Sequence, residues 1–168
     1  METLIKWNIK YKNYLKFEDV YKYIHGWLKD EEYNSIDGIK ENYEIDYLEK
    51  RNMNNQKEFK IYWKAKKDDT NAEWFSKIYI VSKQTKEIKQ IKNNQQEITP
   101  FFEIEIKIIL EFEPKKIEVQ NQYLKFFEKS YKKDLGKPLD EEKDSYKDKW
   151  TKFLKELKEK MDAISIKV

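Results

Sequence analysis

The sequence predicts an α+β domain in which a curved antiparallel sheet of five to six strands packs against one N-terminal helix and two C-terminal helices. Three observations lead to this fold class. A long segment alternates apolar and charged residues, several shorter alternating segments are separated by turns, and a stripe of apolar residues with helical spacing lies near the C-terminus. The 168 residues fit a single domain, residues 1–168.

The segment Phe101–Glu113 carries the clearest signal. Its even-numbered positions are all apolar, and the odd-numbered positions between them are charged with the exception of Ile109. The apolar positions are Phe102, Ile104, Ile106, Ile108, Leu110 and Phe112. Successive side chains of a strand point to opposite faces, so this pattern predicts a long strand with one buried face and one solvated face. Such a strand is typical of an antiparallel sheet.

The composition favours a folded chain over a disordered one. Charged residues make up 40% of the chain and hydrophobic residues 39%, a balance that by itself is compatible with disorder. However, the chain also has 5 Trp, 12 Tyr and 9 Phe, only 3 Gly and 3 Pro, and a net charge of only +3. We therefore expect a folded domain whose core is built from few but large side chains.

Several classes of protein are disfavoured by what the chain lacks. It has no cysteine, which excludes disulfides and thiolate metal sites. It has no apolar run of about 18 residues, and Met1–Lys12 has no signal-peptide core, so we expect no membrane span and a cytoplasmic location. Arg51 is the only arginine, so the chain offers almost no guanidinium groups for bidentate phosphate or guanine contacts.

Shorter alternating segments predict the other strands of the sheet. They are Thr3–Tyr11, Tyr43–Tyr47, Phe59–Ala65, Glu73–Ser82 and a short strand around Lys86–Ile91. Between them lie turn signals at Asp37-Gly38, Asn52–Gln56, Lys67–Asn71 and Lys92–Gln96. Both parities of Glu73–Ser82 carry apolar residues, so this strand is expected to be covered on both faces.

Apolar stripes predict three helices. The first is Asn13–Asp30, and the second runs from about Asn121 to Lys133 and ends at Leu135-Gly136-Lys137-Pro138. The last helix has the strongest pattern, with acidic residues in its first turns and lysines near its end. Its stripe consists of Tyr146, Trp150, Phe153, Leu154, Leu157 and Met161.

This order of elements resembles that of the helix-grip folds, in which a sheet cups a long helix and often encloses an apolar cavity. The resemblance lies in element order alone, and it assigns no functional residues. It implies a cup between the sheet and the C-terminal helix. The residues expected to line this cup are Trp63, Ile78, Ile106, Trp150, Phe153 and Leu157.

Catalytic and metal chemistry find little support in the sequence. His25 is the only histidine and has no ligand or acidic partner at helical spacing, so a helix residue at the edge of the packed face is favoured over a general base or a metal ligand. Glu103, Glu105, Glu111 and Glu113 form an acidic row that fits either a carboxylate-based hydrolase or a cation site. A solvated face paired with lysines such as Lys60, Lys64 or Lys86 is the favoured interpretation. We expect no cofactor, and an enzyme is disfavoured.

Single-stranded nucleic-acid binding is an alternative hypothesis. Lys60, Tyr62 and Lys64 form a predicted platform on one sheet face, where an aromatic ring between two lysines resembles the surfaces that hold single strands. The near-balanced charge disfavours this function, because nucleic-acid-binding proteins usually carry a basic stripe.

The sequence is best interpreted as a non-enzymatic binding or scaffold module. Large aromatic side chains with few small partners tend to leave either a cavity or an exposed patch. The two forms of this hypothesis are a cup for an apolar small molecule and a subunit that docks on a protein partner.

Overall fold

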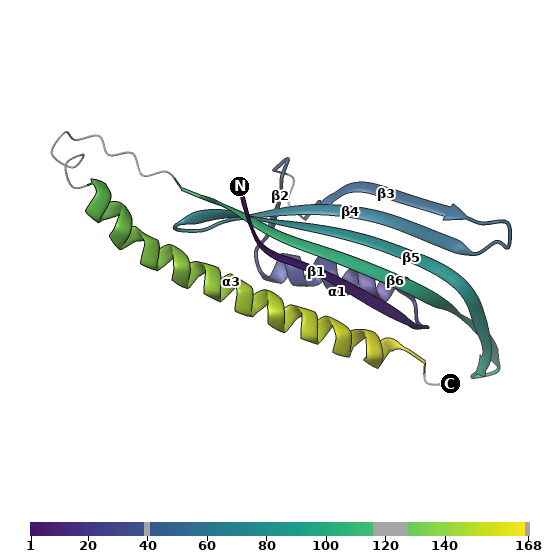
Figure 1. Ribbon diagram of the computed structural model, residues 1–168. Helices are drawn as coiled ribbons and strands as arrows, with labels where there is room; N and C mark the ends of the chain where they lie inside the picture. The colour runs from purple at the N-terminus through teal and green to yellow at the C-terminus, as the bar shows by residue number, and fades with distance from the viewer. Residues whose placement is uncertain (39–40, 116–127, 167–168) are drawn as a thin grey trace.

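The computed structural model describes residues 1–38, 41–115 and 128–166, and for 128–136 it describes the backbone. This part of the chain forms a curved, unclosed antiparallel sheet of six strands with one N-terminal and one C-terminal helix (Figure 1). The predicted α+β class and the antiparallel sheet are therefore confirmed.

The elements are β1 (Glu2–Tyr14), α1 (Phe17–Asp30), β2 (Asn34–Ser35), β3 (Glu44–Arg51), β4 (Lys57–Asp68), β5 (Ala72–Lys92), β6 (Gln95–Pro114) and α3 (Glu128–Ile164). Strands β3 to β6 form an antiparallel meander, and two further strands, β1 and the short β2, pair at its edges. The sheet order is β1-β6-β5-β4, and both β3 and β2 pair with the outer side of β4 at different points along it.

The register of β6 places its predicted apolar stripe on one face of the sheet. Ile106 lies between Ile9 of β1 and Ile80 of β5, and directly paired residues share a face. All six even-numbered residues of the stripe are at most 2% exposed. The predicted facing of β6 is therefore confirmed, and this face is the floor of the core.

Both helices pack on that same face through aromatic rings. Phe17 of α1 stacks on Phe59 of β4, with ring centroids 4.8 Å apart. Tyr146 of α3 stacks on Trp74 of β5 at 4.0 Å. The helices also contact each other through Trp27 and Phe153, whose ring centroids are 4.2 Å apart. Figure 1 shows α3 running along the sheet beside β1.

The opposite face of the sheet, the open face, carries no packed helix within the described ranges. The expectation that Glu73–Ser82 is covered on both faces is wrong there, because Tyr79 is 37% exposed. Its ring stacks on Tyr62 of β4 at 4.5 Å. Phe75 is shielded instead by Lys64 and Lys66, whose ammonium groups each lie 5.8 Å from its ring. Neighbouring rings and lysine side chains thus replace a second layer.

The C-terminal helix differs from the prediction of two helices. Residues 121–127 of the first predicted helix lie outside the described residues, and from Glu128 onward α3 is continuous to Ile164. The predicted end at Leu135-Gly136-Lys137-Pro138 is wrong, since Pro138 lies inside the helix. Proline removes one backbone N–H at a cost of about 3 kcal/mol, but its fixed φ is compatible with a helix.

The predicted short strand at Lys86–Ile91 is the end of β5 and not a separate strand. A bulge between Gln84 and Lys86 interrupts the pairing with β6 but does not end it. The hairpin closes at Asn93 and Asn94, whose positive φ angles of 50° and 60° fit a tight turn that follows the twist of the strands. The predicted turn at Lys92–Gln96 is confirmed.

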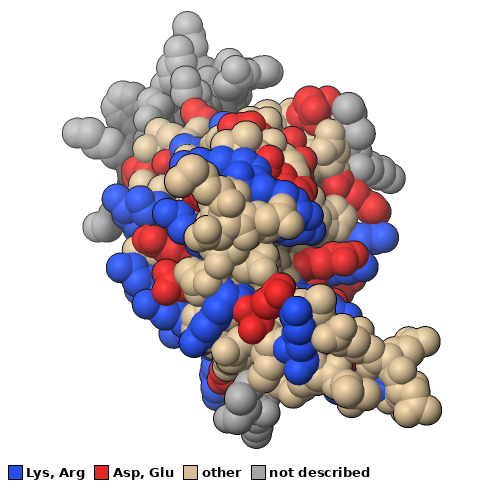
Figure 2. All heavy atoms as spheres, turned by 90° about the vertical axis from the view of Figure 1, so that its right-hand side faces the viewer, with Lys and Arg blue, Asp and Glu red and all other residues tan. Residues whose placement is uncertain are grey.

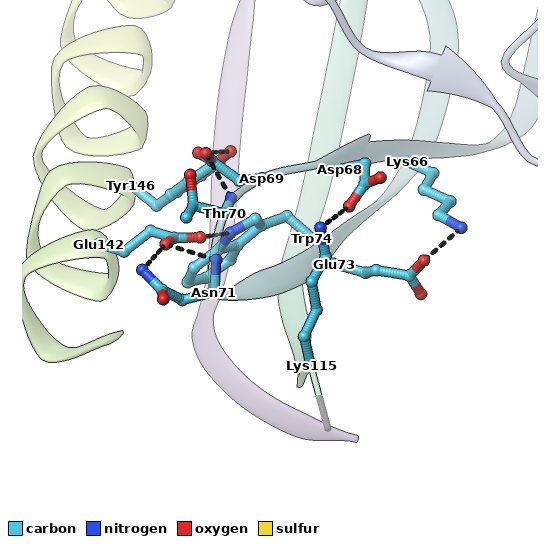
Figure 3. Close-up of polar contacts among 10 residues, drawn as sticks. All are labelled: Lys66, Asp68, Asp69, Thr70, Asn71, Glu73, Trp74, Lys115, Glu142 and Tyr146. Atoms are coloured by element: carbon cyan, nitrogen blue, oxygen red, sulfur yellow. Dashed lines mark hydrogen bonds and ion pairs between the residues drawn. The ribbon is translucent and has the colours of Figure 1, made fainter. Parts of the chain in front are cut away.

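A polar cluster fixes α3 to the β4–β5 turn (Figure 3). Glu142 of α3 accepts hydrogen bonds from Trp74 Nε1 at 2.9 Å, from Asn71 Nδ2 at 2.8 Å and from the Asn71 backbone N at 3.2 Å. Tyr146 donates its hydroxyl to Asp69 Oδ2 at 2.9 Å. A carboxylate with three donors is held in one orientation, so Glu142 sets the position of α3 along the sheet.

Substitution of Ile106 by aspartate tests the facing of β6. An unpaired buried carboxylate costs roughly 3–5 kcal/mol, so Ile106→Asp is expected to prevent cooperative folding. Glu105→Ala, on the opposite face of the same strand, is the matched control and is expected to be nearly silent. Thermal melts followed by circular dichroism give the result. A cooperatively melting Ile106→Asp protein would contradict the assigned facing.

Removal of the Glu142 carboxylate tests the contact between α3 and the β4–β5 turn. Glu142→Ala leaves the Trp74 N–H without an acceptor and is expected to reduce the free energy of unfolding by about 2–3 kcal/mol. Glu141→Ala, at an exposed neighbouring position, is expected to change it by less than about 0.5 kcal/mol. Urea unfolding monitored by tryptophan fluorescence measures both. Equal effects of the two substitutions would argue against a role for Glu142.

Candidate binding pocket

A hollow of about 560 Å³ lies between the N-terminal half of α1 and the β3–β4 hairpin. Its volume falls within the range of roughly 300–1,000 Å³ that is common for small-molecule sites. We call it the α1–β3 pocket. It is lined by Phe17, Glu18, Tyr21, Lys22, Glu44, Tyr47, Glu49, Lys57 and Phe59.

Aromatic rings from three elements form the apolar part of the α1–β3 pocket. Phe17 and Phe59 come from α1 and β4 and are stacked, and both are buried. Tyr47 of β3 lies next to them, with its ring centroid 6.3 Å from that of Phe59. Tyr47 is 42% exposed, so part of its ring is accessible from solvent. The pocket therefore offers apolar ring surface that a ligand can cover.

Two tyrosine hydroxyls orient carboxylates at the rim of the pocket. Tyr21 donates to Glu44 Oε2 at 2.6 Å, and Tyr47 donates to Glu49 Oε2 at 3.1 Å. Burial, followed by the hydrogen bond to the carboxylate, raises the pKa of Tyr47 to about 12 and also raises the pKa of Tyr21. Both phenols thus remain neutral donors at physiological pH and hold their glutamates in fixed positions.

The charges of the α1–β3 pocket are only partly compensated. Glu18 pairs with Lys22 at 2.7 Å, and Lys57 lies 3.8 Å from Glu49. Glu44 forms no ion pair with any residue that the structure describes, and it is partly shielded from solvent. Although the chain is rich in lysine, the Glu44 carboxylate is bonded to a tyrosine and to none of the described lysines. It can therefore form a charge-assisted hydrogen bond with a cationic group of a ligand.

The described residues do not bring together a catalytic set at this pocket. His25 lies further along α1, where its Nε2 lies 2.9 Å from the Glu41 carbonyl oxygen and its ring contacts Tyr43 at 5.2 Å. Within residues 1–38, 41–115 and 128–166, no group of three histidines or acids is arranged to hold a metal ion. The arrangement at the pocket is suited to binding through rings and carboxylates.

The residues predicted to line a cup all belong to one buried cluster. Each of the six is at most 1% exposed: Trp63, Ile78, Ile106, Trp150, Phe153 and Leu157. None of them lines the α1–β3 pocket. Trp63 comes nearest, because its ring contacts Tyr21 edge-to-face at 4.7 Å. A ligand cup at these six residues remains a prediction.

The nucleic-acid candidates Lys60, Tyr62 and Lys64 all lie on the open face. They pair with the odd-numbered residues Val81, Tyr79 and Lys77 of β5, which belong to that face. Tyr62 packs against Tyr79. Acids lie among the lysines of this face, since Glu103 pairs with Lys12 and Glu111 with Lys77. Figure 2 shows acidic and basic side chains mixed also over the end of the molecule that lies at the right of Figure 1. Nucleic acid would favour a large basic surface, and that view shows none.

The acidic row of β6 also lies on the open face and pairs across strands. Glu103 contacts Lys12 at 3.5 Å, Glu111 contacts Lys77 at 2.7 Å, and Glu105 accepts a hydrogen bond from Asn8 at 2.9 Å. Glu113 lies opposite Glu73 at the end of the strand. The lysines differ from those expected, Lys60, Lys64 and Lys86, because β1 and the first half of β5 are the neighbours of this part of β6.

Sequence reasoning did not find the α1–β3 pocket. Its carboxylate Glu44 and its tyrosines Tyr21 and Tyr47 are distributed over two elements whose relative position depends on the fold. One signal was present, since β3 has apolar residues at Ile45, Tyr47 and Leu48, more than a short edge strand can bury.

No protein-family model matches the chain, and no curated protein matches it. No helix in the described part of the chain has both the length and the apolar character needed to cross a membrane. The geometry and charge of the α1–β3 pocket are therefore the observations that bear on function.

Proposed function

We propose that the protein is a non-enzymatic binding module and that the α1–β3 pocket binds a small organic cation with an aromatic or apolar body. The observation that carries this proposal is the presence, in one hollow, of accessible ring surface and of a carboxylate, Glu44, that has no cationic partner among the described residues.

The two parts of the pocket suit the two parts of such a ligand. The exposed part of the Tyr47 ring offers apolar contact to the ligand's body, and aromatic faces also attract a nearby cation. An ammonium group next to Glu44 would form a charge-assisted hydrogen bond, and the hydroxyl of Tyr21 already orients that carboxylate. A site that is oriented before binding loses less conformational entropy on binding.

This proposal keeps the binding module predicted from the sequence and moves its site. The packing of both α1 and α3 on the concave face supports a helix-grip-like arrangement. The proposed ligand lies beside α1, at the end of the sheet that α3 does not cover, instead of between the sheet and α3. Single-stranded nucleic acid on the open face is the alternative, favoured by the Tyr62–Tyr79 pair and disfavoured by the acids among the lysines.

Three indole probes whose side chains end in groups of different charge test the proposal. Tryptamine carries an ammonium group, 3-ethylindole is neutral, and indole-3-propionate is an anion. We expect tryptamine to bind most tightly and the anion most weakly, because Glu44 attracts the cation and repels the carboxylate. Ligand-observed NMR titration measures the three affinities. Equal affinities for the cation and the anion would contradict the proposal.

Two substitutions locate the binding. Glu44→Gln keeps the shape of the side chain and removes its charge, so we expect about tenfold weaker binding of tryptamine and little change for 3-ethylindole. Glu105→Gln is the control on the open face and is expected to leave both affinities unchanged. Loss of tryptamine binding in the Glu105→Gln protein, or full retention in the Glu44→Gln protein, would place the site elsewhere.

A further inference from the structure

Strand β3 has a free edge. Among the strands that the structure describes, it pairs only with β4, and its hairpin closes with the bond from Asn52 N to Gln56 O at 3.0 Å. From this bond the pairing alternates as far as Asp46, where a bulge between Glu44 and Asp46 shifts the register. Over this stretch the even-numbered residues of β3 direct their backbone groups toward β4. The N–H and C=O groups of Tyr47 and Glu49 therefore point away from the sheet.

The side chains along this edge are unusually apolar for a solvated strand. Ile45 is 54% exposed and Leu48 is 47% exposed, in addition to Tyr47 described above. A free edge with exposed apolar residues is a template for pairing with another strand. Figure 1 shows β3 at the border of the sheet, with no other described strand on its outer side.

The sequence of β3 is complementary to itself in one antiparallel register. A two-fold axis perpendicular to the sheet keeps each face of the sheet on the same side in both copies. Residues that lie opposite each other across the axis therefore share a face, so both have even numbers or both have odd numbers. With the axis at Leu48, the leucines of two copies meet, and Asp46 of each copy lies opposite Lys50 of the other. Asp46 forms no ion pair with the described residues, and Lys50 contacts only Glu58, at 3.6 Å.

The neighbouring register fits less well. With the axis at Tyr47, Asp46 lies opposite Leu48 and Ile45 lies opposite Glu49, so charged and apolar residues face each other. In the Leu48 register, the Asp46–Lys50 pairs occupy positions without mutual backbone hydrogen bonds, where side chains approach most closely. Charge and hydrophobicity thus select one register.

We infer that two copies of the chain form a dimer by antiparallel pairing of their β3 strands, centred on Leu48. The two sheets then form one continuous sheet. The outward backbone groups of Tyr47 and Glu49 gain partners, and two pairs of opposite charge form across the axis.

The pairing also joins the two ligand sites, a consequence that rests on the proposed function. Tyr47 and Glu49 both line the α1–β3 pocket. In the Leu48 register, Tyr47 of one copy lies opposite Glu49 of the other on the same face of the sheet. The pockets of the two copies therefore lie side by side across the axis, and each receives a side chain from the partner.

Charge reversal tests the dimer and its register. Sedimentation velocity over about a hundredfold range of concentration is expected to show a monomer–dimer equilibrium for the wild-type chain. Asp46→Lys and Lys50→Asp are each expected to weaken dimerisation at least about tenfold, because each places two like-charged pairs across the axis. The double variant Asp46→Lys/Lys50→Asp is expected to restore it.

The control is Lys147→Asp, an equal change of charge at an exposed position of α3, which is expected to dimerise like the wild type. Circular dichroism confirms that each variant folds. A wild type that is monomeric at every concentration, single variants that dimerise normally, or a double variant that stays monomeric would each overturn the inference. Tryptamine binding by a monomer would leave the proposed function intact, and a dimer that does not bind tryptamine would leave the pairing intact.

Discussion

Burial of one face of β6 under the aromatic side chains of two helices is the constraint on which the rest of the structure depends. The even-numbered residues of this strand lie inside the sheet, between the edge strand β1 and β5. Phe17 from α1 and Trp150 from α3 belong to the same buried cluster as these residues. A chain in which 40% of the residues are charged has few apolar residues to distribute, so it concentrates them in a single layer.

This concentration explains where the two candidate surfaces lie. With α1 and α3 both on the concave face, the odd-numbered residues of β6 and β5 remain on an open face that is maintained by cross-strand pairs such as Lys77–Glu111. The β3–β4 hairpin extends beyond the part of the sheet that α3 covers, as Figure 1 shows. Of the two described helices only α1 borders its inner side, where the α1–β3 pocket lies, and its outer edge has no neighbour among the described strands.

The sequence predicted the features that depend on local periodicity. The facing of Ile106 and the stripe from Tyr146 to Met161 follow directly from periods of two and 3.6 residues. Features that depend on how elements meet were not predicted. The contact between Tyr21 and Glu44 joins residues of α1 and β3, and no local pattern encodes it. The passage of α3 through Pro138 and the bulge at Gln84 are cases in which pairing and packing override a local break signal.

The measurement that tests this account most directly is the reactivity of single cysteines at two adjacent positions of β6. The chain has no cysteine of its own, so an introduced thiol gives an unambiguous signal. Ile108 is fully buried in the core, whereas Ile109 belongs to the open face and is partly exposed. The account predicts that the thiol of Ile109→Cys reacts rapidly with a maleimide in native buffer, whereas that of Ile108→Cys reacts only after denaturation. Equal reactivity at the two positions, or faster reaction at position 108, would contradict it.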